Sequence, residues 1–369
     1  MKKLTVAIAA LTVAAGISAQ NYRIEGSYPG HDGTKVQIVG SDKSVIDSTV
    51  VVDGKFLLTN PLTAVQAASL RVGDNGKDAF ILYEKPITVT CTEKEVVDRS
   101  GTPAIVTEID FNGDPEQAIH DRVSNAVLMD VLMMFSVGMS AQDTTLNAQE
   151  RESIKAAFAQ ARESKERLLD SVATNCTDNY ATALAMLEHL APNLKYPEME
   201  KLWNGLTPRV QQSAIGQQLN AKIQELKAVS MGSEAPDFSL PTPEGGQLSL
   251  KEALKGKKAL LIDFWASWCG PCLREAPNIK NVYSKYKDKG FEVLSVSLDD
   301  NAPAWTDAIK NHGLNWLHIS ALKGWDCPVA KIYNVTAVPA MFLLDGDGRI
   351  VSTNARGEQL EIEVAKLCK

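Results

Sequence analysis

The chain has 369 residues, 44% of them hydrophobic, and a formal net charge of −7 from 38 basic and 45 acidic residues. This length predicts two or three domains, and the weak acidic balance gives no electrostatic reason to expect nucleic-acid binding. After residue 20, no stretch is apolar for the roughly 18 residues that a membrane-spanning helix requires.

The first 19 residues have the pattern of a secretory signal peptide. Lys2 and Lys3 precede an almost uncharged apolar segment, residues 4–17, which is short for a bilayer span. The small residue Ala19 predicts cleavage before Gln20; the alternative is cleavage after Gly16, because Ile17 is bulky for its position before that site. We therefore expect a mature chain in the periplasm; the alternative is an uncleaved anchor or a buried helix.

Residues 20–114 contain short β-branched or alternating runs, separated at close intervals by Gly, Asp, Asn and Pro. The dipeptide Asp53-Gly54 lies between two such runs and is a strong hairpin signal. These patterns predict an all-β domain with a small, antiparallel, sandwich-like arrangement.

Residues 115–228 change to a helical period. One helical face gathers the apolar residues Ile154, Phe158, Ala161 and Leu168. Asn147 and Glu150 have the spacing of a capping box at the start of this helix. A second helix ends at Pro192, and a third is predicted over residues 210–229.

A segment rich in Ser, Pro and Gly near residue 230 marks the next boundary. Beyond it, strands and helices alternate. The expected strands are residues 259–266, 291–298, 340–345 and 349–354, and the expected helices begin at Cys269, near Trp305 and near Leu360. This order predicts an α/β domain with a partly parallel sheet over residues 229–369.

The stretch DFWASWCGPC, residues 263–272, combines an acid within an apolar run with two closely spaced cysteines. Cys269 and Cys272 share one helical face and meet disulfide geometry, and Pro271 suits a first helical turn. We expect Cys269 to be exposed at the helix N-terminus, where N–H groups and the dipole favour its nucleophilic thiolate. We expect Cys272 to be shielded.

Two other interpretations of this cysteine pair are weaker. A zinc site needs a second pair of ligands, and the isolated histidines do not have the required spacing. These histidines are His120, His189, His312 and His318. An inert structural disulfide leaves the acid in the strand unexplained. A C-x-x-C motif near a βαβ pattern indicates a redox dithiol instead, and no metal or cofactor is expected.

FWASWCGPC, preceded by Asp263, resembles the thioredoxin active-site segment. The wider region, residues 230–369, with GSEAPDFSL and YNVTAVPAMFLLDGDGRIV, resembles the TlpA/ResA-type branch of exported thioredoxin-fold thiol–disulfide oxidoreductases. Residues 22–228 resemble, more loosely, the β-rich domain of unknown function and the helical segment that precede such domains in Bacteroidetes proteins. The expected fold class is an α/β thioredoxin fold at the C-terminus, preceded by an all-β sandwich-like domain and a helical segment. The expected boundaries are 1–19, 20–114, 115–228 and 229–369.

The resemblance implies roles for individual residues. Cys269 would attack and Cys272 resolve, as a redox-active Cys269–Cys272 disulfide. Pro339 would be the cis-proline beside the dithiol, and Val338 would offer backbone groups to a substrate strand. The same resemblance places on the substrate-binding surface Trp268, Gly270, Pro271 and Gly357.

Two acids are candidates for proton transfer. Asp263 within an apolar strand is costly unless it is paired or protonated, and such an acid can accept the proton of the resolving thiol. Glu275 follows Cys272 by three residues and shares its helical face; in the TlpA/ResA-type branch a glutamate here modulates the thiols. The alternatives are an exposed strand-end aspartate and a solvated helix acid. Residues 291–300 lack the lysine that thioredoxin pairs with its aspartate, so different tuning is expected.

The other four cysteines are open to several interpretations. Cys327, just before Pro328 at another helix start, is a third low-pKa redox thiol, a disulfide partner for Cys368, or an incidental small residue. Cys91 and Cys176 are interpreted as incidental.

The leading functional hypothesis is an exported oxidoreductase that reduces protein disulfides through a mixed disulfide. Gly-Pro between the cysteines resembles thioredoxin rather than strong oxidants, which indicates a reductant. The expected partners are cysteine-containing exported proteins and, as electron donor, a membrane thiol-transfer protein. The alternatives are a partner-binding or assembly protein with a secondary redox domain, and a thiol peroxidase, because APDFSL also opens peroxiredoxin-like domains. The oligomeric state is not predicted.

Overall fold

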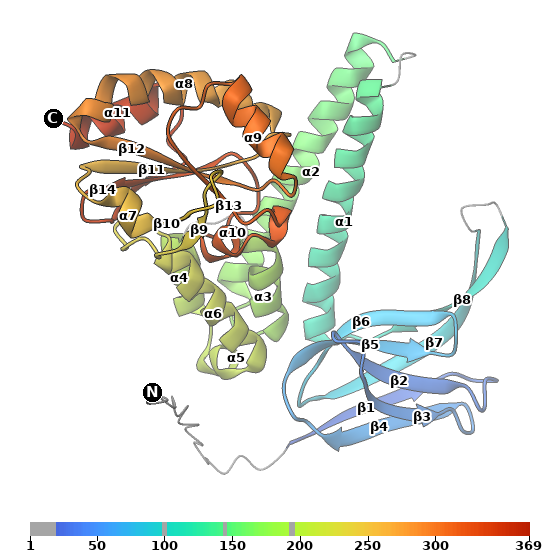
Figure 1. Cartoon of the computed structure of the whole chain (residues 1–369). Helices are drawn as coiled ribbons and strands as arrows, with labels where there is room; N and C mark the ends of the chain where they lie inside the picture. The colour runs from blue at the N-terminus through green and yellow to red at the C-terminus, as the bar shows by residue number, and fades with distance from the viewer. Residues whose placement is uncertain (1–19, 98–101, 143–145, 192–195) are drawn as a thin grey trace. The chain divides into compact units, whose positions relative to one another are not determined.

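The computed structural model describes residues 20–97, 102–142, 146–191 and 196–369 (Figure 1). The expected signal peptide lies outside these residues. The chain divides into two compact units: Met1–Ala185 with Leu206–Gln217, and Met186–Gly205 with Gln218–Lys369. None of the helices in the described part of the chain has the length and apolar character of a membrane span.

The N-terminal unit contains one eight-stranded sheet. Its strands are β1 (Asn21–Ser27), β2 (Lys35–Gly40), β3 (Val45–Val50), β4 (Lys55–Pro61), β5 (Gln66–Val72), β6 (Gly76–Leu82), β7 (Pro86–Val97) and β8 (Pro103–Asp110). They lie in the order β3-β2-β5-β6-β8-β7-β1-β4. The β-rich prediction is confirmed, but a purely antiparallel arrangement is wrong, because β1 with β7 and β6 with β8 are parallel pairs.

The turn at Asp53-Gly54 is present, with positive φ angles of 49° and 67°. It does not close an extended hairpin, because β3 and β4 are the two edges of the sheet; among the described residues, their backbone pairing at this turn is the single bridge Val52–Lys55. Asp47 on β3 links these edges further, since its Oδ2 accepts a 2.9 Å hydrogen bond from Asn60 on β4. The sheet therefore curls until its edge strands meet.

Two long helices follow the sheet, α1 (Pro115–Gln142) and α2 (Ala148–Asn175), and they pack against each other. The predicted capping box begins α2: Asn147 Oδ1 accepts the N–H of Glu150 at 2.9 Å, and Glu150 Oε2 accepts the N–H of Asn147 at 2.8 Å. This part of the helical prediction is confirmed.

The shorter helices are α3 (Tyr180–Ala185), the wider turn η1 (Met186–Leu190), α4 (Tyr196–Gly205), α5 (Pro208–Gln212) and α6 (Ala214–Ala228). The prediction of one helix over residues 210–229 is wrong, because Ser213 separates α5 from α6. Its Oγ donates to the carbonyl of Val210 at 2.6 Å and accepts the N–H of Gly216 at 3.0 Å. Pro192, the predicted end of the second helix, lies outside the described residues.

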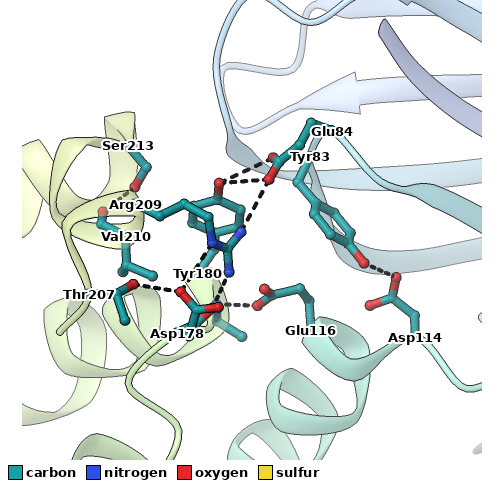
Figure 2. Close-up of polar contacts among 11 residues, drawn as sticks. Tyr83, Glu84, Asp114, Glu116, Asp178, Tyr180, Thr207, Arg209, Val210 and Ser213 are labelled. Carbon is teal, nitrogen blue, oxygen red and sulfur yellow. Dashed lines mark hydrogen bonds and ion pairs between the residues drawn. The ribbon is translucent and has the colours of Figure 1, made fainter. Parts of the chain in front are cut away.

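A polar cluster ties the segment Leu206–Gln217 to the N-terminal unit (Figure 2). The Arg209 guanidinium contacts Glu84 and Asp178, each at 3.2 Å, and lies over the ring of Tyr180. The Tyr180 hydroxyl also donates to Glu84 at 3.0 Å. Arg209 thus neutralises two carboxylates at once, which fixes α5 in this unit.

The C-terminal unit contains a five-stranded sheet in the order β13-β12-β11-β14-β15. Its strands are β11 (Ala259–Trp265), β12 (Phe291–Ser297), β13 (Leu317–Ser320), β14 (Ala340–Asp345) and β15 (Ile350–Thr353), and a separate two-stranded ribbon is β9 (Ser239–Pro241) with β10 (Gln247–Ser249). Its helices are α7 (Leu250–Leu254), α8 (Gly270–Tyr286), α9 (Ala302–Asn311), α10 (Pro328–Ile332) and α11 (Glu358–Leu367), with short 3-10 turns η2 (Lys287–Lys289) and η3 (Gly324–Asp326). β11, β12 and β13 are parallel, and β14 and β15 are antiparallel to their neighbours.

Two apolar cores cover the two faces of this sheet. Alternate residues of β11 point to opposite faces: Leu261 packs with α8 and α11, whereas Ile262 packs with α7, α9 and α10. This is the thioredoxin fold with both faces covered, as predicted. Asp263 lies in register on the face that α8 and α11 cover, beside Ser295 on β12.

Candidate active site

The cysteine pair lies where β11 gives way to α8. Cys269 is the N-cap residue of α8, and its Sγ accepts the backbone N–H of Cys272 at 3.2 Å. Cys269 and Cys272 form a disulfide with a Cα–Cα distance of 5.3 Å. Gly270 and Pro271 between them are exposed. One N–H of the first helical turn thus points at the Cys269 sulfur, and this position at the helix N-terminus favours a thiolate when the pair is reduced.

The expected difference in exposure between the two cysteines is wrong for the disulfide form. Cys269 is 3% exposed and Cys272 is 5% exposed. Both are shielded because the disulfide packs into the core together with Trp265 and Ala276. The N-cap hydrogen bond, rather than solvent access, is what distinguishes the two sulfurs here.

The loop after β15 holds the segment that carries the proline. The Val338–Pro339 peptide bond is cis, as expected. The guanidinium of Arg356 donates to the carbonyl oxygen of Pro339. Asn354 makes two further bonds to β14, because its N–H donates to the carbonyl of Met341 at 2.7 Å and its Oδ1 accepts the N–H of Met341 at 3.2 Å. Val338 is half-buried and keeps part of its surface open.

The same loop is bound to α8 through Glu275. Glu275 Oε1 accepts the N–H of Gly357 at 2.8 Å and an N–H of the Asn278 side chain at 2.7 Å. Asn278 also donates to the carbonyl of Gly357 at 3.1 Å. Gly357 has a φ of 54°, a conformation that glycine adopts without strain. Glu275 therefore positions this loop, and its Oε1 is already committed to two donors.

Asp263 is the buried acid of the site. It is 4% exposed, and the pKa of its carboxyl is raised to about 6; burial is the main cause, the hydrogen bond from Ser295 and the charge of Arg356 oppose the rise, and the charge of Glu275 adds to it. Its Oδ2 accepts the hydroxyl of Ser295 at 2.9 Å, and its Oδ1 has no hydrogen-bond partner among the described residues. A buried carboxyl with one free oxygen can take up a proton near neutral pH.

The hydroxyl of Ser295 is oriented by a second hydrogen bond. The indole Nε1 of Trp316 donates to Ser295 Oγ at 2.8 Å. An indole N–H is a donor only, so the single hydroxyl proton is left to point at Asp263. We expect the surroundings of Asp263 to differ from those of the aspartate in thioredoxin, because the lysine is missing. In this chain a hydroxyl on β12, that of Ser295, donates to the carboxyl.

The loop before Cys269 is anchored by Asp299, which lies two residues after the end of β12 and is buried. Its carboxylate accepts the hydroxyl of Ser267 at 2.6 Å, the N–H of Ser267 at 3.0 Å and the hydroxyl of Ser297 at 2.6 Å. Trp268, which follows Ser267, is 56% exposed. The fold thus presents the Trp268 ring to solvent on a fixed turn.

The remaining cysteines, Cys91, Cys176, Cys327 and Cys368, are free thiols. Cys327 and Cys368 are fully buried in different apolar cores, on opposite faces of the sheet, so their pairing is ruled out. Cys327 is the N-cap residue of the short α10 and makes no side-chain capping hydrogen bond there. Burial raises the pKa of Cys91 to about 11 and raises that of Cys368 as well. Cys176 is half-buried and free.

Sequence reasoning missed several residues that shape the site. These are Asn278, Ser295, Asp299 and Arg356. Asp299 carries a signal in retrospect, since a polar residue at the carboxyl end of a parallel strand lies at the edge where such sites form. Arg356 carries none, because its contact with Pro339 spans two loops that only the fold brings together.

Comparisons with known proteins agree with this geometry. The Redoxin family matches residues 230–367, and a domain of unknown function, DUF4369, matches residues 22–119. Thiol-disulfide oxidoreductase ResA of Bacillus thuringiensis subsp. konkukian is 33% identical over 141 residues, which span 38% of this chain and 78% of that protein. The chain belongs to the ResA family of thiol–disulfide oxidoreductases.

Further members and solved structures are similar over the same region. ResA of Bacillus subtilis is 32% identical over 132 residues, covering 36% of this chain and 71% of its own length. The thioredoxin domain of a thiol-disulfide oxidoreductase from Bacteroides vulgatus is 32% identical, with 38% of this chain and 99% of that chain covered and a TM-score of 0.36. A thiol-disulfide oxidoreductase from Bacteroides fragilis is 34% identical, with 37% of this chain and 99% of that chain covered and a TM-score of 0.34. In this ResA-family chain, the dithiol, the cis-proline and the buried acid all lie within the matched region.

Proposed function

We propose that this chain is an exported reductase of protein disulfides, working in the periplasm. The observation that carries the proposal is the Cys269 sulfur at the start of α8, with the Cys272 N–H pointing at it. Export is supported by the signal-like pattern of residues 1–19. The reductive direction is supported by the Gly-Pro dipeptide between the cysteines, which resembles thioredoxin.

The reaction would begin with the reduced dithiol. The Cys269 thiolate attacks one sulfur of a substrate disulfide, the substrate S–S bond breaks, and the leaving substrate thiolate takes a proton from solvent. A mixed disulfide now joins Cys269 to the substrate. The strand edge at Val338, beside the cis-proline, would hold the substrate backbone during this step.

The second step would release the substrate. Asp263 accepts the proton of the Cys272 thiol, and the Cys272 sulfur attacks the Cys269 sulfur. The mixed disulfide breaks, the second substrate thiolate leaves and takes up a proton, and the Cys269–Cys272 disulfide remains. Two electrons have moved to the substrate, so a thiol donor must restore the dithiol; we propose a membrane thiol-transfer protein for this role.

Trapping of the mixed disulfide tests the mechanism. Cys272→Ser should accumulate covalent adducts with disulfide-containing exported proteins, visible on a non-reducing gel and released by a reductant. Cys269→Ser should trap few or none, and the double variant none. Adducts on Cys272 alone would exchange the two roles, and their absence in both single variants would argue against protein disulfides as substrates.

The reduction potential tests the direction. We expect a value near −270 mV, about that of thioredoxin, for the Cys269–Cys272 pair. A value near −120 mV, about that of strong oxidants, would mean that the chain oxidises its substrates.

One observation favours assembly as a second candidate function of the N-terminal unit. Residues 128–135 of α1 expose large apolar side chains, namely Leu128, Met129, Val131, Leu132, Met134 and Phe135. The one charge within this stretch, Asp130, is paired with Lys165 on α2. We propose a second copy of the chain as the partner, because the same uncharged segment on two copies can pack together about a two-fold axis. Sedimentation should show a dimer that Leu132→Glu dissociates; a wild-type monomer would refute it.

A further inference from the structure

Trp325 is a large exposed residue close to Trp268, and the proposed reaction steps do not involve it. It lies in η3 (Gly324–Asp326) and is 47% exposed, and its ring centroid lies 6.3 Å from that of Trp268, with 51° between the ring planes. This distance is within the range of interacting aromatic pairs. Two half-exposed indole rings therefore stand side by side, one of them on the residue that precedes Cys269.

Asp299 fixes the turns that carry the two rings. Its buried carboxylate accepts both the N–H and the hydroxyl of Ser267, the residue before Trp268. Its backbone carbonyl lies 3.5 Å from the N–H of Gly324, the residue before Trp325. A pair of rings held in this way loses little conformational entropy when a ligand binds to it.

The charges around the pair indicate which ligand it fits. Asp326 is paired with Lys331 at 2.7 Å, so it does not leave a free negative charge beside Trp325. A guanidinium nitrogen of Arg274 lies 3.5 Å from the position that a Cβ on Gly270 would take, next to the dithiol. A cationic side chain on the rings would meet this positive charge, whereas a neutral apolar side chain would not.

We propose that Trp268 and Trp325 together form a docking surface for an apolar side chain, preferably aromatic, that flanks the reactive cysteine in an extended segment of the protein substrate. This inference rests on the proposed function. Trp325 is then a residue that determines specificity, and Asp299 and Ser267 are positioning residues that hold the two rings.

Four disulfide-bonded peptides that differ only in the residue next to the cysteine, Phe, Ser, Lys or Glu, test this inference. We expect reduced wild-type protein to prefer the Phe peptide to the Ser peptide about tenfold in kcat/KM. Trp325→Ala should bring this ratio close to one, mainly through KM, and Trp325→Phe should restore part of it. Ile332→Ala, which removes an exposed apolar side chain from α10, is the matched control and should keep the full preference.

Each other outcome has a definite meaning. A preference for the Lys peptide that Trp325→Ala abolishes would show that the rings bind cations, which overturns the inference. Equal rates on all four peptides, or an unchanged ratio in Trp325→Ala, would also overturn it while leaving disulfide reduction intact. If the wild type reduced none of the peptides, the proposed function itself would fall.

Discussion

Two buried carboxyl groups, one in each unit, have opposite surroundings. Glu116 on α1 is 2% exposed and Asp263 on β11 is 4% exposed, and burial raises the pKa of both. Glu116 accepts the N–H of Ala181 at 2.8 Å and lies near the cation Arg209 (Figure 2). Asp263 has one hydroxyl donor and one oxygen without a partner.

The hydrogen bonds around these two carboxyl groups distinguish two ways in which a protein uses a buried acid. A buried charge that is paired and hydrogen-bonded holds a structure together, and removing its partner is costly. A buried acid that is only half satisfied destabilises the fold when ionised, and a cost of this kind is retained where the group has chemistry to perform. Glu116 therefore has the surroundings of a structural acid, whereas those of Asp263 are the ones expected of an acid with chemistry to perform.

The largest expected effect comes from breaking the paired cluster. Arg209→Met would leave Glu84 and Asp178 facing each other without their shared cation. We expect a loss of about 3 kcal/mol in the free energy of unfolding, at the low end for a buried pair because Arg209 is partly exposed. Denaturant unfolding measures this. Arg167→Met, which removes an exposed ion pair on α2, is the matched control and should change stability by less than about 0.5 kcal/mol.

The second effect is a gain in stability at Asp263. Below about pH 4 this carboxyl is protonated in both the folded and the unfolded chain, and above its folded pKa of about 6 it is ionised in both. The contribution of this carboxyl to the free energy of unfolding is therefore highest below about pH 4, and it is lost as the pH rises through 6. The free energy of unfolding of Asp263→Asn, compared with that of the wild type, should therefore rise by about 2 to 3 kcal/mol as the pH goes from 4 to 8. Unfolding curves of equal pH dependence for the two proteins would contradict this.

The third effect concerns the resolving step. Asp263→Asn cannot accept the Cys272 proton, so release of the mixed disulfide should slow about tenfold to a hundredfold near pH 7. The wild-type rate should rise as the pH passes about 6, where the carboxyl becomes ionised, and the variant should lack this limb. Stopped-flow measurement of mixed-disulfide decay against pH tests both points. Identical profiles would remove Asp263 from the mechanism.

The smallest effect is expected at Glu275. Glu275→Gln keeps an oxygen that can accept the N–H of Gly357 but loses the negative charge that strengthens this bond. We expect a few-fold rise in KM for protein substrates, because the loop beside Pro339 loosens, with the pH limb near 6 retained. Loss of that limb in Glu275→Gln, but not in Asp263→Asn, would make Glu275 the proton acceptor instead.

Much of the site was predictable from local sequence because its chemistry is local. Cys269, Cys272 and the turn between them lie within four residues, and the N-cap contact forms within one helical turn. The sequence alone therefore indicated the dithiol, the helix start and the alternation of strands and helices after residue 229. The N-terminal unit was less predictable, since β1 with β7 and β6 with β8 pair across long separations that strand patterns do not encode.

Only the tertiary structure decided which distant segments of the chain contact each other. The acid in β11 was visible in the sequence, but its pairing with Ser295, 32 residues away, and its free Oδ1 depend on the register of the sheet. Likewise Gly357 reaches Glu275 across 82 residues. The physical reason is that hydrophobic period and capping act over one or two turns of chain, whereas hydrogen bonding and desolvation at a buried group depend on whichever segments the packed core brings to it.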